Sequence, residues 1–145
     1  MKANETIIVE EQLSAPISVV WDAITNLNSM KKWFFNNIPS FKSEVGFKTQ
    51  FNVKSEERNF LHLWEIIEVV PSKKIVYNWK YAEYSGNSLV YFELFENINN
   101  TTKIKLTCKI TESFSDDIPE FKTESCRGGW NYFIKQNLKN YLENS

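Results

Sequence analysis

The chain has 145 residues, with 17 basic against 18 acidic side chains and a formal net charge of −1. This balance provides no excess of positive charge that would attract nucleic acid. No apolar run approaches the roughly 20 residues that are needed to cross a bilayer. The first residues also lack the apolar stretch of a signal peptide, so we expect a cytoplasmic protein. The length suits one domain, and we expect residues 1–145 to form it.

The aromatic content is the unusual feature of the composition. The chain contains 5 Trp, 6 Tyr and 11 Phe, but only 4 Gly and 4 Pro. Aromatic side chains in this quantity fill either an ordinary core or the wall of a cavity. The two cysteines, Cys108 and Cys126, form no CxxC motif, and we interpret them as reduced structural thiols. A disulfide between them would require their Cα atoms to lie within about 7 Å of each other.

The N-terminal part of the chain predicts one strand and two helices. Residues 6–13 place apolar side chains at alternating positions, as in a strand. Pro16 suits a first helical position, and the apolar residues that follow it predict a helix over 16–25. Ser29 then favours a second, short helix over 30–34.

From about residue 45 the apolar pattern changes to a period of two. This alternation, and the turn residues that interrupt it, predict a series of antiparallel strands. In the last of them the apolar side chains oppose a row of lysines, which indicates a solvent-facing side. The predicted strands cover residues 46–54, 60–70, 75–81, 90–94 and 102–110.

The C-terminal part predicts a single long helix. Acidic residues and a proline at 116–120 favour its start, and apolar residues between Trp130 and Tyr141 then recur at intervals of three and four. Gly128 and Gly129 lie within it, although each glycine destabilises a helix interior by about 1 kcal/mol relative to Ala. A kink or a close approach of another backbone would explain their presence. We therefore predict an α+β fold. A strongly curved antiparallel sheet of about six to seven strands wraps on the long C-terminal helix, with two short helices after the first strand.

Short motifs in a fixed order resemble one known family. The stretch from Ala15 to Thr25, Ala-Pro-Ile-Ser-Val-Val-Trp-Asp-Ala-Ile-Thr, resembles the signature of the domain named for the activator of the heat-shock protein 90 ATPase. That domain belongs to the START-like superfamily of polyketide cyclases, lipid-transfer domains and pathogenesis-related plant proteins. The resemblance implies a helix-grip fold, but no common chemistry. Further matches are Lys32-Trp33, Gly46, Glu68-Val69-Val70-Pro71, Val76-Tyr77-Asn78-Trp79, Thr102-Lys103-Ile104 and Gly129-Trp130.

Two positions depart from the family pattern. Val45 stands where the family usually has the first of two glycines, and Trp64 falls near a position that is often glycine. Both residues add bulk beside the predicted sheet. We therefore expect a pocket that is smaller or differently shaped.

The sequence contains no metal motif, phosphate-binding glycine loop or nucleophile elbow, so we predict no catalytic residue, no metal and no cofactor. His62, Glu65 and Arg127 are candidate polar anchors for a ligand. A packed His62 and solvated positions for Glu65 and Arg127 are the plainer interpretations. The predicted cavity lining, for which ordinary core packing is equally consistent, comprises Trp33, Phe34, Phe47, Phe51, Trp64, Tyr77, Trp79, Phe92, Trp130 and Phe133.

Three functions fit these observations. The first is a binding protein, monomeric or homodimeric, that sequesters or presents a small hydrophobic or aromatic molecule. The second, implied by the resemblance, is a protein that interacts with a chaperone and stimulates its ATPase. The third is a cyclase-like or hydrolase-like enzyme. An inward polar cluster around His62, Glu65 or Tyr77 would favour the enzyme, and a uniformly apolar cavity would argue against it.

Overall fold

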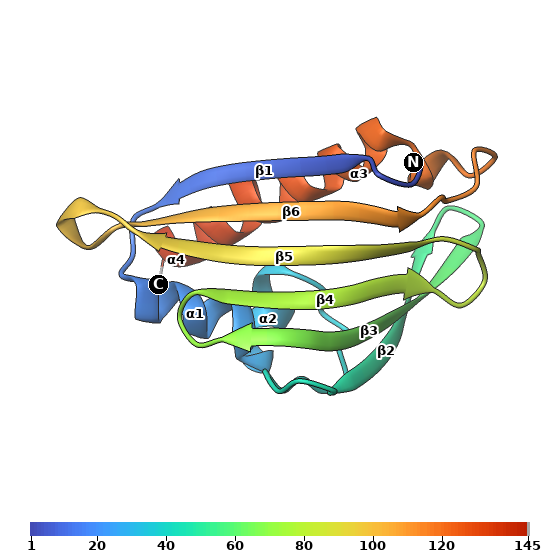
Figure 1. Ribbon diagram of the computed structural model, residues 1–145. Coiled ribbons are helices and arrows are strands. Elements are labelled where there is room, and N and C mark those ends of the chain that lie inside the picture. Colours follow the sequence, from blue (N-terminus) through green and yellow to red (C-terminus); the bar gives the residue numbers. More distant parts are fainter. Residues whose placement is uncertain (145) are drawn as a thin grey trace.

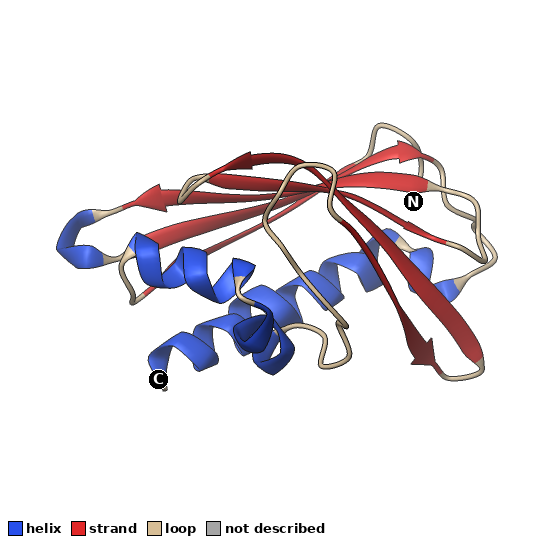
Figure 2. Cartoon of the chain, turned by 90° about the horizontal axis from the view of Figure 1, so that it is seen from below, coloured by secondary structure: helices blue, strands red, loops and turns tan. Residues whose placement is uncertain are grey.

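The computed structural model describes residues 1–144. A six-stranded antiparallel sheet with the strand order β1-β6-β5-β4-β3-β2 forms one layer. All the larger helices lie on one face of this sheet (Figure 1 and Figure 2). The strands are β1 (Thr6–Leu13), β2 (Lys48–Ser55), β3 (Arg58–Val70), β4 (Lys74–Tyr81), β5 (Asn87–Glu96) and β6 (Thr102–Glu112).

The predicted helix-grip architecture is confirmed. Strands β2 to β6 follow one another as a meander, and β1 closes the order by pairing with β6, where Ile7 lies opposite Cys108. The two short helices after the first strand, and the long helix at the end of the chain, both cover the face that the sheet curves around (Figure 2). No helix within residues 1–144 is long and apolar enough to cross a membrane.

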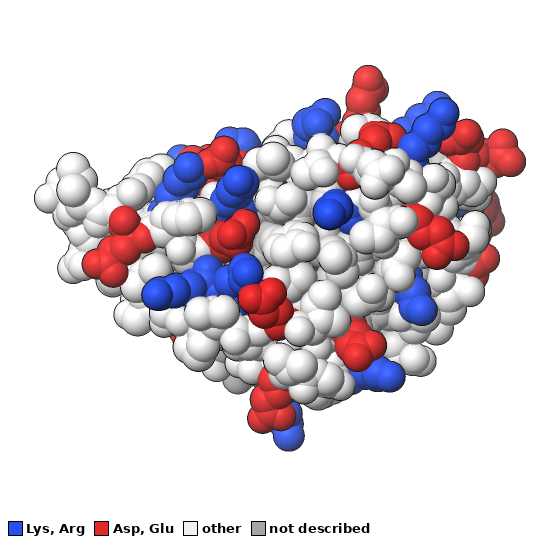
Figure 3. Space-filling model, viewed as in Figure 1, with Lys and Arg blue, Asp and Glu red and all other residues white. Residues whose placement is uncertain are grey.

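Alternation along β6 separates the two faces of the sheet. Ile104, Leu106 and Ile110 are buried against the helices, as expected from their spacing. The lysine row points outward, and Lys103 forms an ion pair with Glu10 of β1. Figure 3 shows acidic and basic side chains interspersed over this view, with no large area of one sign.

Asn26 joins the two short helices, α1 (Ile17–Thr25) and α2 (Leu27–Trp33). Its backbone N–H donates to the carbonyl oxygen of Asp22 at the end of α1, and its side-chain oxygen accepts from the N–H of Ser29 at 3.3 Å. Asparagine suits such a cap because its short side chain places the amide oxygen within reach of a free backbone N–H group in the first turn. The prediction that Ser29 caps a helix over 30–34 is therefore wrong, because α2 begins earlier and contains Ser29.

The long C-terminal helix consists of α3 (Thr123–Trp130), a π-helical turn segment η3 (Asn131–Leu138) and α4 (Lys139–Glu143). The backbone angles at both junctions are α-helical, so the helix is continuous. Its widened middle follows Gly128 and Gly129. A Cβ at either glycine would meet no atom within 4 Å, so a close backbone approach does not explain them.

The predicted helix start at residues 116–120 is wrong. A short 3₁₀ turn, η2 (Pro119–Phe121), occupies this region, and Lys122 is extended before the helix begins at Thr123. The break lets the side chain of Phe121 enter the core, where it is 3% exposed. Burial of this ring outweighs the local preference for continuous helix. A second 3₁₀ turn, η1 (Ile98–Asn100), connects β5 to β6.

Candidate functional site

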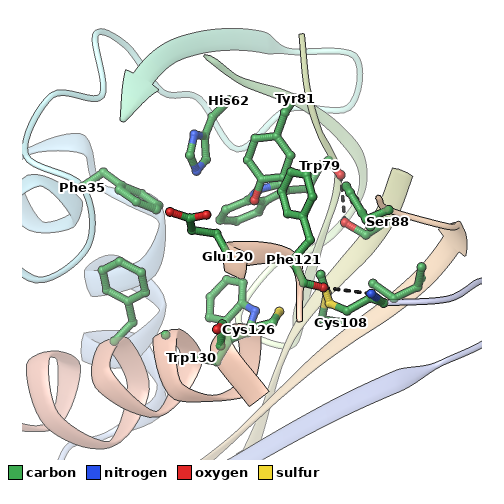
Figure 4. Close-up of a pocket in the computed structure, with 16 residues that line it drawn as sticks. Phe35, His62, Trp79, Tyr81, Ser88, Cys108, Glu120, Phe121, Cys126 and Trp130 are labelled. Atoms are coloured by element: carbon green, nitrogen blue, oxygen red, sulfur yellow. Dashed lines mark hydrogen bonds between the residues drawn. The ribbon is translucent and has the colours of Figure 1, made fainter. Parts of the chain in front are cut away.

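A cavity of about 150 Å³ lies between the C-terminal helix and strands β3 to β6. Helix α3 and η2 form one wall, and the inward side chains of the sheet form the other (Figure 4). Aromatic rings make up much of the lining, with two thiols and a few polar groups between them. The aromatic members of the lining are Phe35, Trp79, Tyr81, Phe114, Phe121, Trp130 and Phe133.

His62 supplies an acceptor to this cavity. Its Nδ1 lies 2.9 Å from the carbonyl oxygen of Phe60. A carbonyl oxygen only accepts, so Nδ1 carries the proton in the neutral ring, and Nε2 keeps a free lone pair. Burial lowers the pKa of His62 from 6.5 to about 4, against the opposing effect of the bond to Phe60. The imidazole, which points into the cavity in Figure 4, is therefore neutral at pH 7.

Tyr81 supplies a donor. The indole Nε1 of Trp79 donates to its hydroxyl oxygen at 3.1 Å, and residues 1–144 provide no acceptor for the phenolic proton. Burial raises the pKa of Tyr81, so the hydroxyl stays protonated. The hydroxyl of Ser88 also lines the cavity, but it already donates to the carbonyl oxygen of Trp79 at 2.8 Å. The free polar groups thus include one nitrogen acceptor and one hydroxyl donor.

Glu120 lies at the rim of the cavity, half-exposed, and is held by the β2–β3 hairpin. Arg58 Nε donates to its Oε1 at 2.8 Å, and the hydroxyl of Ser55 donates to its Oε2 at 2.8 Å. The Arg58 guanidinium lowers the pKa of the Glu120 carboxyl, so this group is ionised at neutral pH. Because its oxygens already have partners, Glu120 closes the rim and presents little free charge to the interior.

Two free cysteines share the wall of the cavity. Cys108 lies on β6 and is buried, whereas Cys126 lies in the first turn of α3 and is partly exposed. The interaction between their side chains raises the pKa of Cys108 and lowers that of Cys126. No group of three or more His, Cys, Asp or Glu residues in the described part of the chain is arranged to hold a metal ion.

The sequence model of the Activator of Hsp90 ATPase homolog 1-like proteins matches residues 14–143. The chain belongs to this family. The match covers the helix pair and all of the cavity lining except Met1, and it confirms the resemblance seen in the ordered motifs. A comparison with curated protein sequences gave no significant match.

Solved structures share the fold of this Hsp90-ATPase-activator-like chain at low sequence identity. Protein CV1439 from Chromobacterium violaceum is 20% identical over 95% of this chain and 96% of its own, with a TM-score of 0.78. PFC0360w, an HSP90 activator from Plasmodium falciparum, is 23% identical over 95% and 96%, with a TM-score of 0.74. DynU16 from the dynemicin biosynthetic locus is 20% identical with a TM-score of 0.75, and this chain spans only 47% of it.

The aromatic residues predicted to line a cavity fall into two groups in this family member. Trp79, Trp130 and Phe133 line the cavity together with His62. The others pack beside it as an aromatic cluster, in which Trp64 meets the ring of Tyr77 edge-on with centroids 5.0 Å apart. The predicted residues outside the lining are Trp33, Phe34, Phe47, Phe51, Trp64, Tyr77 and Phe92.

The two departures from the family pattern have different consequences. Trp64 is 2% exposed and takes up interior volume, as expected. Its Nε1 has no hydrogen-bond partner in the described chain, and the surrounding rings offer only π faces. Val45 is 66% exposed, so the expectation that it adds bulk beside the sheet is wrong.

The other two candidate anchors lie away from the cavity. Glu65 is on the outer face of β3, opposite Lys48 and Asn78, so the candidate anchor at this position does not point into the cavity. Leu61 and Leu63 lie two and four residues before Glu65 and therefore on the same outer face. Because they are apolar, the alternation of residue types does not show which face of β3 points inward. Arg127 is exposed on α3 and is not part of the cavity lining.

Several lining residues were not predicted from the sequence. Tyr81 shares its parity with Tyr77 and Trp79, so the alternation of β4 could have found it. Glu120 and Cys126 have no comparable signal, because the cavity brings them together with the sheet only after η2 and α3 fold back onto it.

Proposed function

We propose that this protein is a cytoplasmic binding protein that holds a small hydrophobic molecule in the cavity beneath α3. The supporting observation is a cavity of about 150 Å³ walled largely by aromatic rings. Apolar cavities of about this volume hold a single benzene ring, whereas sites for drug-sized ligands are roughly 300–1,000 Å³. The favoured ligand is therefore a single-ring or short-chain compound.

The polar groups disfavour a cation and favour a ligand with one or two hydrogen-bonding atoms. His62 Nε2 accepts and the hydroxyl of Tyr81 donates, while the one carboxylate at the rim, Glu120, is engaged by Arg58. The lining also holds a positive charge, the N-terminal ammonium of Met1, which donates to the carbonyl oxygen of Phe121 at 2.8 Å. A cationic ligand would lose its hydration here without a free counter-charge, which is costly. A hydroxyl group on the ring can donate to Nε2 of His62 and accept from the hydroxyl of Tyr81, whereas a carbonyl group can only accept from Tyr81.

A ligand panel tests this proposal. The melting temperature is measured with phenol, benzaldehyde and benzene, and with two-ring and long-chain analogues at equal free concentration. Single-ring ligands should raise it, since a ligand at about 100 times its Kd adds roughly 2.7 kcal/mol to stability. If no compound shifts the melting temperature, or if the large compounds act as strongly as the small ones, the proposal is wrong.

Chaperone activation is the second candidate function. Family membership supports it, as does the fold shared with PFC0360w, a HSP90 activator, over nearly the whole of both chains. The test measures the ATPase rate of the chaperone with increasing amounts of this protein. A saturable rise in the rate supports this function, whereas an unchanged rate together with no co-sedimentation excludes it.

A further inference from the structure

The two cysteines meet although they come from different layers of the fold. Cys108 points from β6 toward the helices, and Cys126 points from α3 toward the sheet (Figure 4). Both thiols are free, both line the same cavity, and each has the largest single effect on the pKa of the other. A pair of free thiols that face each other across one cavity wall is an arrangement that can be oxidised without refolding.

The surroundings of the two thiols differ in a way that divides their roles. Cys126 lies in the first turn of α3. Its interaction with Cys108 is the largest cause of its lowered pKa, and the N-terminal ammonium of Met1 and the guanidinium of Arg127 also favour its thiolate. Cys108 is 4% exposed, and the same interaction and its burial raise its pKa. The thiolate is the nucleophile in such pairs, so Cys126 is the attacking member.

We propose that Cys126 and Cys108 form a reactive dithiol site, which a peroxide oxidises to an internal disulfide between α3 and β6. The sulfur of Cys126 attacks one oxygen of the peroxide, the O–O bond breaks, and the leaving oxygen is protonated; with hydrogen peroxide it leaves as water. The sulfur of Cys108 then attacks the resulting sulfenic acid, and its S–O bond breaks. The hydroxyl leaves as water with the proton of Cys108. The two sulfurs lose two electrons, and the peroxide gains both.

Disulfide formation changes the cavity wall. Bonded sulfurs lie about 2.05 Å apart, closer than two thiols in contact, so the bond draws α3 toward β6. The oxidised protein therefore has a smaller space beside Trp130 and Ser88, which flank the pair. The oxidation itself needs no ligand, so it goes beyond the proposed binding function. A negative result for ligand binding would leave it unaffected.

The folded protein is treated with hydrogen peroxide near equimolar amounts, and free thiols are then alkylated. The expected intact mass is 2 Da lower than that of the reduced protein, with no alkylation. Trypsin should release one cross-linked pair, made of the peptides 106–109 and 123–127, which carry Cys108 and Cys126. Two alkylated thiols, or a disulfide-linked dimer in place of the internal bond, would overturn the proposal.

Single substitutions test the order of attack. In Cys108→Ser, the oxidation should stop at a sulfenic acid on Cys126, which dimedone traps. In Cys126→Ser, Cys108 should react at least tenfold more slowly, because it is buried and its thiolate is disfavoured. Equal rates for the two variants would contradict the assignment. Should Cys108→Ser fail to fold, brief dimedone trapping in the unsubstituted protein decides the same point, and label on Cys108 alone would overturn it.

Discussion

The indole of Trp79 donates a hydrogen bond of 3.1 Å to the hydroxyl oxygen of Tyr81, two residues further along the same inward face of β4. This bond uses an acceptor position of the phenol and leaves its proton for a ligand. The contact thus orients the hydroxyl group of Tyr81, which becomes a hydrogen-bond donor on the wall of the cavity. It is also the most direct point at which to test the proposed binding function.

Tyr81→Phe removes this donor while keeping the ring. Ligands with an acceptor atom, such as benzaldehyde, should bind about twofold to tenfold more weakly, since a neutral hydrogen bond contributes about 0.5–1.5 kcal/mol. Benzene should bind with unchanged Kd. Calorimetric titration measures both. Tyr84→Phe is the matched control, because Tyr84 packs against Phe60 and Phe121 but does not line the cavity. Equal losses for benzaldehyde and benzene would argue against a ligand bond to Tyr81.

His62 should make the protein sensitive to mild acid. Burial lowers its folded-state pKa to about 4, below the ordinary value of 6.5, so the unfolded chain binds the proton more readily. Its contribution to stability is complete above pH 6.5 and is lost as the pH falls toward 4. The loss is about 3 kcal/mol, since each pKa unit corresponds to about 1.36 kcal/mol.

The measurement is urea unfolding between pH 7 and pH 4 for the unsubstituted protein and for His62→Phe. Carboxyl groups titrate in both proteins, so the difference between the two curves isolates the histidine. The free energy of unfolding should fall more steeply with acid in the unsubstituted protein. Parallel curves would show that the imidazole is not held neutral by burial.

Gly128 and Gly129 form a matched pair for testing the cavity. Both lie in α3 with open space around a built Cβ, but only Gly129 lines the cavity. Alanine at either position should raise the free energy of unfolding by up to about 1 kcal/mol, through helix propensity. Gly129→Leu should then abolish the shift of melting temperature by single-ring ligands, whereas Gly128→Leu should preserve it. Loss of binding in both variants would indicate a general disturbance of the helix.

Gly86 is required where the turn after β4 approaches Phe114. Its φ is +120°, and a built Cβ would lie 2.4 Å from Cδ1 of that ring. Gly86→Ala should therefore lower the free energy of unfolding by about 2 kcal/mol or more, because backbone strain and a steric clash add. Gly46→Ala is the control, since Gly46 has φ +90° but no atom within 4 Å. Equal losses for the two variants would show that Phe114 moves aside at little cost.

Local patterns in the sequence were sufficient for most of the fold. The opposition of apolar residues and lysines along 102–110 predicted β6, its buried face and its exposed face, because side chains alternate strictly in a strand. Pro16 marked the start of α1 for a similarly local reason. The ordered motifs identified the family without any knowledge of the site.

The alternation of residue types does not show which face of a strand is buried where both faces carry apolar residues. In β3 the outer face carries Leu61 and Leu63, so the sequence could not show that His62 points inward and Glu65 outward. The pairing of β3 with its two neighbours decides this orientation. The helix start failed for a related reason, because the burial of Phe121 depends on rings from distant strands.

The sequence by itself thus determined the order of the elements and the curved sheet, which follow from short-range periodicity and capping, and its ordered motifs indicated the family. Only the tertiary structure decided which aromatic side chains wall the cavity, and that Cys108 meets Cys126 there. Both depend on the placement of α3 across the sheet. That placement is set by the packing of many side chains at once, and no local stretch of sequence encodes it.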